Sequence, residues 1–579
     1  MRTTTRKRAC AAAAAFAALL AITGLAACTA AETSDEEEAD EELVELDDVV
    51  CTSDYVDASD DDVAAWLEGT VYDVDAQADI AEQLDADKDG ATFASPLIVY
   101  NPFGTNSQSL YVYFTTAETA SVTYTVSVSD EQVATIEDES LAATSIADFT
   151  RDVDDGASAT EFEFTLYGLI PNVINDVTIV ATYEDGTTQT LAFACDMCDV
   201  LGDEKLQLEY EDGESDAELS DGLYAMLGSE SDTTDFTYLY DNDGILRGEI
   251  PIVDGRVHRF IFEDDLMYFC TTKYHIAAMN SIGQIVRMYE TDTDGDYQVH
   301  HDLISDGEDH LIALITDADS DTIEDLVMFV NQQTGEIDYT IDMGELLADY
   351  KEQALAYFAE NGTEEDEAGY GTEEGVDWLH INGLAWMGDD SLLLSCREVS
   401  TIIKVSDVYG TPTLEYFISS EEYWEDTVYE DYVYEKVGDF TVQGGQHCIE
   451  YIEDDSLDDG QYYVTMYNNN IGINTSTTSD FDYTSIGLTS GTKTSDDDDV
   501  YSYYYKYLVD ENAGTFELVD SIAVPYSGYI SSAQDTGSTV VTASGVLNIF
   551  EEYDEDGVLI RSFTMDLGRI LYRVIKYDL

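Results

Sequence analysis

Apolar and polar residues alternate with a period of two between residues 91 and 198. The alternation is clearest in Leu110–Thr116, Ser121–Val128, Glu161–Leu166 and Asp176–Tyr183. Successive side chains of a β-strand point to opposite faces, so this pattern predicts strands with one buried face. Four or more short strands within about 100 residues favour a small antiparallel sandwich of the immunoglobulin type. We therefore expect residues 91–198 to form an N-terminal β-sandwich domain.

Short strand patterns recur from residue 199 to residue 579, separated by turns rich in Asp, Asn and Gly. These turns include Asp241–Gly244, Asp292–Gly295 and Asp554–Gly557. Strand–turn units at this density are typical of a β-propeller, whose blades have four strands each. Six or so blades of roughly 50 to 60 residues would fit, although the periodicity alone leaves their number open. The pattern predicts an all-β protein with a propeller domain over residues 199–579.

Two segments interrupt the strand pattern with helical spacing. Residues 46–90 place Val63 and Leu67 on one helical face, which predicts a helical segment ahead of the sandwich. The stretch Leu346–Glu374 is helix-like and acidic, and it ends just before Asp377. A helix inserted between strand units suits a lid or a rim insertion of the propeller.

The chain is extremely acidic, with 124 Asp and Glu against 22 Lys and Arg and a formal net charge of -102. Nucleic acids bind basic patches that neutralise phosphates, so this charge excludes nucleic acid as a natural partner. Disordered chains share such acidity, but 41 Tyr, 20 Phe and many Val and Ile residues supply a core here. We expect the acidic side chains on solvated faces, where they favour solubility rather than chemistry.

The N-terminus has the pattern of a targeting signal. A basic start, Arg2–Arg8, precedes the apolar stretch Ala9–Ile22, which is too short to span a membrane. The residues up to Cys28 resemble the lipobox of bacterial lipoproteins, which implies cleavage before this cysteine and its diacylation. We expect residues 1–27 to be a lipoprotein signal peptide and residues 28–45 an acidic tether. The protein would then be exported and lipid-anchored on the outer face of a bacterial cell membrane; ordinary secretion is the alternative.

Motifs for metal binding are weak in this sequence. Cys195 and Cys198 form a single C-x-x-C pair, for which a local disulfide or free thiols are favoured over zinc. The pairing of the six cysteines after Cys28 cannot be deduced from their spacing. The stretches Asp85–Gly90 and Asp317–Asp321 resemble the start of a calcium loop but lack the Glu at its twelfth position. Asp-rich turns are the expectation there, calcium stays open, and no cofactor is predicted.

A hairpin predicted over residues 377–397 gathers several functional groups. The run from Asp377 to Asn382 precedes a turn, and the return run ends in Ser395-Cys396-Arg397. Residues two apart on a strand face the same side, so His380 would lie beside Asn382 and Ser395 beside Arg397. The hairpin would thus bring an imidazole, an amide and a guanidinium together at one end.

Histidine is rare, with seven in the chain, and three of them lie in unusual contexts. His301 directly precedes Asp302, His380 lies in the hairpin, and His447 follows a Gly-Gly-Gln stretch in which the glycines allow close backbone approach. A lone histidine in a strand is usually a core or surface residue. Propeller blades converge on a central channel, however, so histidines that are far apart in sequence can meet there.

Several short stretches occur in a characteristic order along the chain: Pro96–Gly104, Phe114–Thr116, Tyr167–Pro171, His300–Asp302, Asp377–Asn382, Ser395–Ser400, Gly445–His447, Met466–Asn469 and Tyr572–Arg573. Each is weak alone. In this order, over nearly the whole mature chain, they resemble the arylsulfate sulfotransferases of bacteria. The resemblance implies a six-bladed propeller with a small N-terminal β domain. It also implies transfer of a sulfuryl group from a phenolic sulfate ester to a phenolic acceptor, without a nucleotide sulfate donor.

The resemblance also implies roles for individual residues. A histidine is sulfated between the two half-reactions in this family, and His447 matches it. Other pocket residues of the family match His380, Asn382, Arg397 and one of the pair His300 and His301. We favour His301, which directly precedes Asp302. Cys448, beside the nucleophile, departs from the family pattern.

The chemistry of these side chains agrees with such a reaction. A neutral imidazole is a competent nucleophile near pH 7. A sulfate ester carries one negative charge, so the Arg397 fork with His and Asn donors would suffice to hold it. A second histidine, His301 or His380, would give a proton to the departing phenoxide and take one from the incoming phenol. Two half-reactions at one site predict ping-pong kinetics.

Two other functions fit the sequence. One is a non-catalytic propeller, a ligand-binding or adhesion lipoprotein. The other is a metal-dependent hydrolase whose ligands would be His300, His301, Asp302 and His380. The oligomeric state is left open, with a homodimer as one option.

Overall fold

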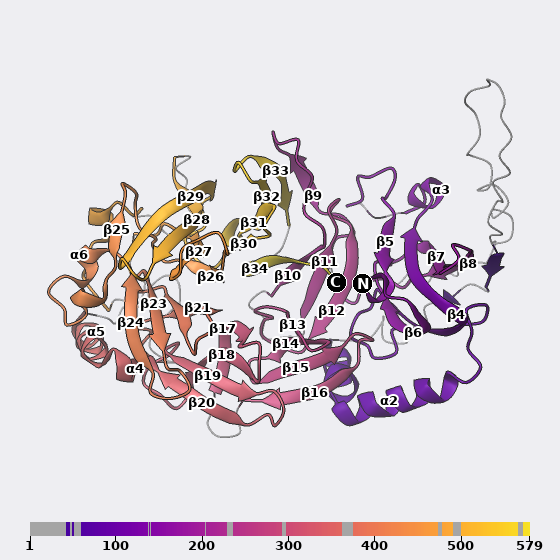
Figure 1. Cartoon of the computed structure of the whole chain (residues 1–579), viewed down its shortest axis with the longest axis horizontal. Helices are drawn as coiled ribbons and strands as arrows, with labels where there is room; N and C mark the ends of the chain where they lie inside the picture. Colours follow the sequence, from indigo (N-terminus) through magenta and orange to yellow (C-terminus); the bar gives the residue numbers. More distant parts are fainter. Residues whose placement is uncertain are drawn as a thin grey trace.

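The computed structural model describes residues 42–46, 49–50, 60–136, 138, 140–202, 204–228, 235–291, 297–361, 375–472, 478–489, 499–565 and 571–579. They form a six-bladed β-propeller with a smaller β domain beside it (Figure 1). Among these residues, no helix combines the length and apolar character that a membrane span requires. Cys28 and the signal peptide predicted before it lie outside the described residues.

The N-terminal domain is built around one long strand, β4 (Leu110–Ser127). Its first part pairs with β3 and β6, and its second part pairs with β5 and β7. Burial alternates along the second part, as the period-two pattern predicted. The other strands are β1 (Glu42–Glu45), β2 (Val49–Val50), β3 (Leu97–Tyr100), β5 (Phe149–Asp152), β6 (Ala159–Leu166), β7 (Ile174–Tyr183) and β8 (Thr188–Asp196).

Helices precede this domain in the segment with helical spacing. They are α1 (Asp60–Trp66), η1 (Leu67–Val71) and α2 (Val74–Asp87). Asp73 caps α2 by accepting a hydrogen bond from the amide of Ala76. The fully buried Gln77 donates to the carbonyl of Phe103 and accepts from the amide of Ile285, which lies in the second blade. One side chain of α2 therefore bridges the two domains.

Each blade is an antiparallel sheet of four strands, extended in two blades by a fifth. The first blade consists of β10 (Leu223–Leu227), β11 (Asp235–Tyr240), β12 (Leu246–Ile252) and β34 (Arg573–Tyr577), and the second of β13 (Ile261–Glu263), β14 (Leu266–Thr272), β15 (His275–Asn280) and β16 (Ile285–Glu290). The third blade consists of β17 (Tyr297–Ser305), β18 (His310–Asp317), β19 (Leu326–Asn331) and β20 (Ile337–Asp342), and the fourth of β21 (Ile381–Trp386), β22 (Leu392–Cys396), β23 (Thr401–Ser406) and β24 (Thr413–Ile418). The fifth blade consists of β25 (Glu435–Val437), β26 (His447–Ile452), β27 (Gln461–Asn468), β28 (Tyr501–Asp510) and β29 (Thr515–Pro525), and the sixth of β9 (Glu209–Asp212), β30 (Ser532–Asp535), β31 (Thr539–Ser544), β32 (Ile549–Asp554) and β33 (Leu559–Thr564).

The ring is closed twice, once from each end of the propeller sequence. The C-terminal strand β34 pairs with β10 in the first blade, and the early strand β9 pairs with β33 in the last. The inner strands β17, β21, β26, β30 and β34 contact one another in turn around the axis. Side chains at the ends of these inner strands therefore meet although they are hundreds of residues apart.

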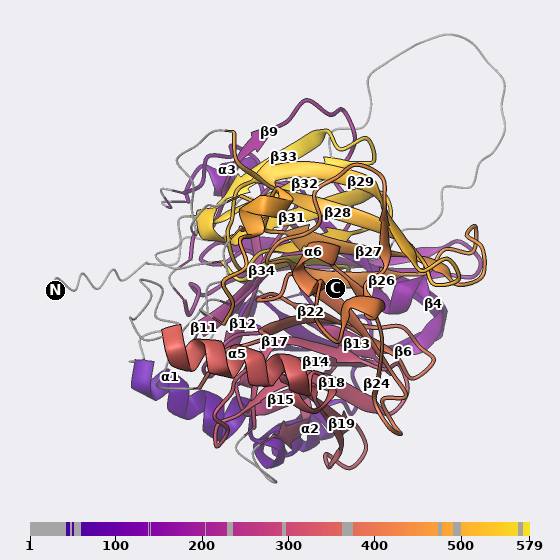
Figure 2. The same cartoon turned by 90° about the vertical axis from the view of Figure 1, so that its left-hand side faces the viewer.

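The predicted insertion between the third and fourth blades begins as helix α5 (Ala348–Asn361), after the short α4 (Met343–Leu346). With α6 (Glu421–Trp424), α5 lies on the side of the propeller away from the N-terminal domain (Figures 1 and 2). Tyr350 of α5 packs its ring against Trp378 and Trp424. This part of the insertion therefore supports the motif that begins at Asp377. The remaining short helices are α3 (Asp130–Val133), η2 (Val153–Gly156), η3 (Glu430–Tyr432), η4 (Tyr483–Ile486) and η5 (Gly545–Leu547).

Two expectations about motifs need correction. Cys198 is disulfide-bonded whereas Cys195 is a free, buried thiol, so this pair forms no local disulfide. Asp85 and Asp87 lie in the last turn of α2, and the expected turn covers only residues 88–90.

Candidate active site

Three neighbouring inner strands each place one residue in the left-handed conformation. These residues are His301 in β17 (φ 53°), His380 just before β21 (φ 53°) and Cys448 in β26 (φ 52°). Residues with a Cβ rarely adopt such angles, and the strand register shifts next to each of them. Such bulges re-aim the neighbouring side chains. The same-face argument for the hairpin was therefore wrong: His380 precedes its strand, Arg397 follows β22, and irregular backbone brings the groups together.

His447 is held in a single tautomer. Its Nδ1 lies 2.8 Å from Asn469 Oδ1 and 3.0 Å from the Gly445 carbonyl oxygen. The amide nitrogen of Asn469 donates to the carbonyls of Ser527 and Ile530, at 2.8 and 2.9 Å, so the amide oxygen must face His447. Because both neighbours of Nδ1 are acceptors, Nδ1 carries the proton. The lone pair is therefore on Nε2, the nitrogen that a nucleophile would use.

The surroundings also keep His447 neutral. The side chain is 2% exposed. Burial, followed by the positive charge of Arg397, holds the pKa of His447 well below its ordinary value of 6.5. The imidazole is therefore uncharged and nucleophilic at neutral pH.

His380 has the opposite charge state. Its Nδ1 lies 2.6 Å from Asp377 Oδ2 and 2.6 Å from Glu324 Oε2. Burial alone would lower its pKa, but the attraction of these two carboxylates outweighs that effect and raises the pKa of His380 to about 10. Burial and the like charge of Glu324 raise the pKa of Asp377 to about 6, so both carboxylates are ionised at pH 7. His380 is thus an imidazolium, which carries a proton on each ring nitrogen.

His301 packs edge-on against His380, with ring centroids 4.8 Å apart. Its Nδ1 lies 2.9 Å from Nδ1 of His300, and its carbonyl accepts a 2.7 Å hydrogen bond from the Tyr572 hydroxyl. Burial and the neighbouring charge of His380 hold its pKa well below the usual range. Of the pair predicted from sequence, it is His301 that lies against the other site histidine.

Arg397 and Asn382 lie beside these histidines and are buried. Arg397 donates from Nη1 to Glu398 Oε1 at 2.7 Å. Asn382 donates from Nδ2 to the carbonyl of Gln446, the residue before His447, at 2.8 Å. Asn382 therefore fixes the backbone that carries the nucleophile.

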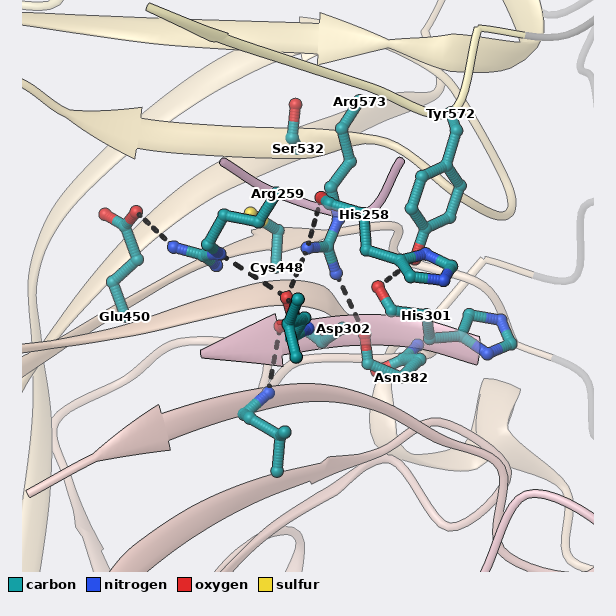
Figure 3. A network of polar contacts seen from close by, with 12 residues as sticks. His258, Arg259, His301, Asp302, Asn382, Cys448, Glu450, Ser532, Tyr572 and Arg573 are labelled. Carbon is teal, nitrogen blue, oxygen red and sulfur yellow. Dashed lines mark hydrogen bonds and ion pairs between the residues drawn. The ribbon is translucent and has the colours of Figure 1, made fainter. Parts of the chain in front are cut away.

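A charge network around Asp302 lies beside His301 and Asn382 (Figure 3). Asp302 is fully buried and accepts from Arg573 Nη1 at 2.8 Å, from Arg259 Nε at 3.4 Å and from the Leu384 amide at 3.1 Å. Arg573 also donates to the Asn382 carbonyl at 3.1 Å. Burial opposes ionisation, but the two guanidiniums hold the pKa of Asp302 below its usual range. Asp302 thus binds the two arginines. The hydrolase hypothesis required Asp302 to be a metal ligand alongside the histidines, and its contacts do not fit that role.

Two groups of side chains among the described residues bring potential metal ligands together. They are His300, His301 and Glu324, and Glu324, Asp377 and His380, with ligand atoms within 4.8 Å of one another. In the second group, however, both carboxylates contact the imidazolium of His380. That cation compensates one of the two negative charges, so a metal ion bound there would have to displace the proton on His380 Nδ1.

The comparisons with known proteins agree with this geometry. Residues 209–567 match the family model described as Arylsulfotransferase (ASST), and residues 97–197 match its companion, the Arylsulfotransferase Ig-like domain. The chain belongs to the arylsulfotransferase family. It is accordingly an aryl-sulfate sulfotransferase, whose family implies an aryl sulfate donor and a phenol acceptor. The six-bladed, all-β fold with an N-terminal immunoglobulin-like domain is confirmed.

Three of the solved structures that match this arylsulfotransferase resemble it distantly. A protein of unknown function from Bacteroides caccae is 9% identical, with 61% of this chain and 98% of that chain covered and a TM-score of 0.34. A putative 6-phosphogluconolactonase from Bacteroides uniformis is 10% identical, with 79% and 97% covered and a TM-score of 0.31. A protein from Lactobacillus plantarum is 11% identical, with 69% and 95% covered and a TM-score of 0.32. None of the curated proteins matches the sequence.

Several site residues of this arylsulfotransferase escaped the reasoning from sequence. Asp377 and Asn469 stand within the quoted motifs, three residues before His380 and in the run Met466–Asn469, so proximity to a histidine or motif could have indicated them. Glu324 gave no such signal, because it follows the Asp-rich stretch at 317–321 in a chain with 124 acidic residues.

Proposed function

We propose that this arylsulfotransferase works by a ping-pong mechanism in which His447 is sulfated on Nε2. The observation that carries the proposal is the environment of His447: two acceptors fix the proton on Nδ1, and burial with Arg397 keeps the ring neutral. A histidine held in this way is a preorganised nucleophile. A structural histidine in a core would not need its Nε2 lone pair kept available.

In the first half-reaction, Nε2 of His447 attacks the sulfur of the aryl sulfate. The N–S bond forms while the S–O bond to the aryl group breaks, and the phenoxide leaves. His380 gives this phenoxide a proton from Nε2. Phenols have a pKa of about 10, so the imidazolium of His380, with a pKa also of about 10, is well matched to that transfer.

In the second half-reaction, the oxygen of an incoming phenol attacks the sulfur. The N–S bond breaks, His447 regains its lone pair, and His380 takes the proton of the phenol. His380 is thus the acid for one phenol and the base for the next, as microscopic reversibility requires for two chemically similar phenols. Arg397 would neutralise charge on the sulfuryl oxygens, as guanidinium groups do in phosphoryl transfer. His301, packed on His380, would line the pocket and keep that ring in place.

Arginines gather around the site although the chain as a whole is strongly acidic. Four arginines lie close to the site: Arg256, Arg259, Arg397 and Arg573. Arg256 is partly exposed and lies 4.4 Å above the ring of Tyr572. The chain has only 22 Lys and Arg in all, so these arginines offset the carboxylates of this region to an extent not matched by the composition of the whole chain. Charges beyond about a Debye length, roughly 8 Å at physiological salt, are largely screened, so an arriving anion meets this local balance more than the net charge of the chain.

The test is sulfuryl transfer from 4-nitrophenyl sulfate, with and without phenol and with and without EDTA. We expect a burst of nitrophenol without phenol, sustained turnover and phenyl sulfate with it, and no effect of EDTA. His447→Ala should abolish the burst, whereas His275→Ala, a histidine of the second blade outside the site, should keep it. Steady release without phenol that EDTA abolishes would favour the metal-dependent hydrolase instead. A sulfated peptide containing residue 447, found by mass spectrometry after the burst, would identify the intermediate.

We also propose that the protein is lipid-anchored through Cys28 on the outer face of a bacterial membrane and that it can form a homodimer. The support for the anchor is the lipobox-like sequence. Metabolic labelling with a fatty acid, lost in Cys28→Ser, tests the anchor. Sedimentation velocity of the protein without residues 1–28 tests the dimer.

A further inference from the structure

We propose that this site selects sulfate monoesters against phosphate monoesters by charge, and that Glu324, Asp377 and Glu398 set this selection. The inference rests on the proposed function, because it concerns the ester that reacts with His447. A sulfate and a phosphate ester are both tetrahedral and present three oxygens to the same donors. Hydrogen bonding alone therefore separates them poorly, and their charges are the main difference.

The carboxylates contact the very cations that would bind the ester. Glu398 is 3% exposed and lies 2.7 Å from Arg397, while Glu324 and Asp377 each lie 2.6 Å from His380. None of the three is needed to hold the nucleophile, whose partners are Asn469 and Gly445. Each of the two cations nearest the reaction thus has its charge opposed by an acid.

Two further arginines are opposed in the same way. Arg573 and Arg259 both contact Asp302, and Arg259 also lies 3.8 Å from Glu450. The described residues of this region include five cations and five carboxylates. The cations are Arg256, Arg259, His380, Arg397 and Arg573, and the carboxylates are Asp302, Glu324, Asp377, Glu398 and Glu450. A site built for phosphate instead carries an excess of positive charge or a helix N-terminus.

The consequence follows from the charges of the two esters. An aryl sulfate has one negative charge, whereas a phosphate monoester has a second pKa of about 6 and two negative charges at pH 8. The second charge has no free cation to meet and is repelled by the carboxylates. One carboxylate roughly 8 Å from the phosphorus, at an effective dielectric constant of about 20, changes a dissociation constant roughly 30-fold. Burial keeps dissolved salt from screening this effect.

Two analogues that cannot transfer a sulfuryl group test the proposal by calorimetric titration at pH 8. Phenyl methylphosphonate is a monoanion and phenyl phosphate a dianion, and they share phosphorus and shape. They differ in charge and in one terminal oxygen, which is a methyl group in the phosphonate, so the change of the preference in the variants, in which this difference is constant, isolates the effect of charge. We expect the wild-type protein to bind the monoanion at least about tenfold more tightly. Glu398→Gln and Glu324→Gln should each reduce this preference by about tenfold or more, chiefly through tighter binding of the dianion.

Controls separate this role from a structural one. Glu551→Gln neutralises a buried acid of the sixth blade outside the site, and it should keep the wild-type preference. A wild-type protein that binds the dianion as tightly as the monoanion would overturn the proposal. So would an unchanged preference in both folded variants, or failure of both analogues to bind an active enzyme. Loss of analogue binding together with absence of sulfuryl transfer would instead refute the proposed function.

Discussion

Asp377→Asn tests the charge state of His380 without changing the size of the side chain. The 2.6 Å contact between Asp377 Oδ2 and His380 Nδ1 puts the two charge centres roughly 4 Å apart. At an effective dielectric constant of about 20 this attraction is worth about 4 kcal/mol, or about 3 pKa units. The Asn oxygen would still accept the Nδ1–H, and the site would relax, so we expect a fall of about 2 units. The pKa of His380 would then move from about 10 to about 8.

The first half-reaction isolates this effect because no acceptor phenol is present. Rapid mixing with phenyl sulfate, whose leaving phenol has a pKa of about 10, gives the rate of the phenol burst, which is quenched and quantified by chromatography under one fixed condition. At pH 9 the protonated fraction of His380 would fall from about nine-tenths to about one-tenth, so the burst should slow about tenfold. At pH 7 the burst rates of the wild-type protein and Asp377→Asn should differ by less than about 1.2-fold, because His380 is protonated in both.

A matched control exists elsewhere in the chain. His310 also lies between two carboxylates, Asp306 at 2.9 Å and Asp338 at 3.2 Å, outside the site. Asp338→Asn should leave the burst unchanged at both pH values. An equal loss of burst rate for Asp377→Asn at pH 7 and pH 9, or no loss at pH 9, would refute the role given to His380.

Because the pKa of His380 is raised on folding, its stabilising contribution is complete below pH 6.5 and is lost as pH rises through 10. Wild-type protein should therefore melt at lower temperature above pH 10.

Three further predictions concern the residues around His380. His447→Ala should lower the burst rate at least about 1,000-fold, as loss of a nucleophile does, while the circular dichroism melt stays close to wild type. Asn469→Ala removes one of two acceptors of the His447 Nδ1–H and should slow the burst about tenfold at saturating donor; an effect confined to KM would contradict this role. Asp302→Ala leaves the buried Arg573 and Arg259 unopposed and should lower the free energy of unfolding by about 3 to 5 kcal/mol in urea titrations. In the wild type the contribution of Asp302, whose pKa is lowered, is present above its usual value of 3.8 and lost as the pH falls below it.

The fold was predictable because burial of one strand face leaves a period-two record in the sequence, and β4 shows it directly. The grouping of His301, His380 and His447 was predictable from rarity, motif and the convergence of blades. The backbone geometry that brings them together was not predictable. Left-handed angles at His301 and His380 and the adjacent bulges do not alter hydrophobic alternation, so no pattern records them. Glu324 could not be found for a different reason: its neighbours in sequence are acidic, and only the fold selects it from them.

The double closure of the ring ties the histidine site to the integrity of the whole propeller. Strand β34 begins at Arg573, directly after Tyr572, and it pairs with β10 of the first blade. If β34 separated from the first blade, His301 would lose the hydroxyl that binds its carbonyl, and Asp302 would lose its closest guanidinium. A local opening at this one seam would therefore disable the site while the other blades stay folded.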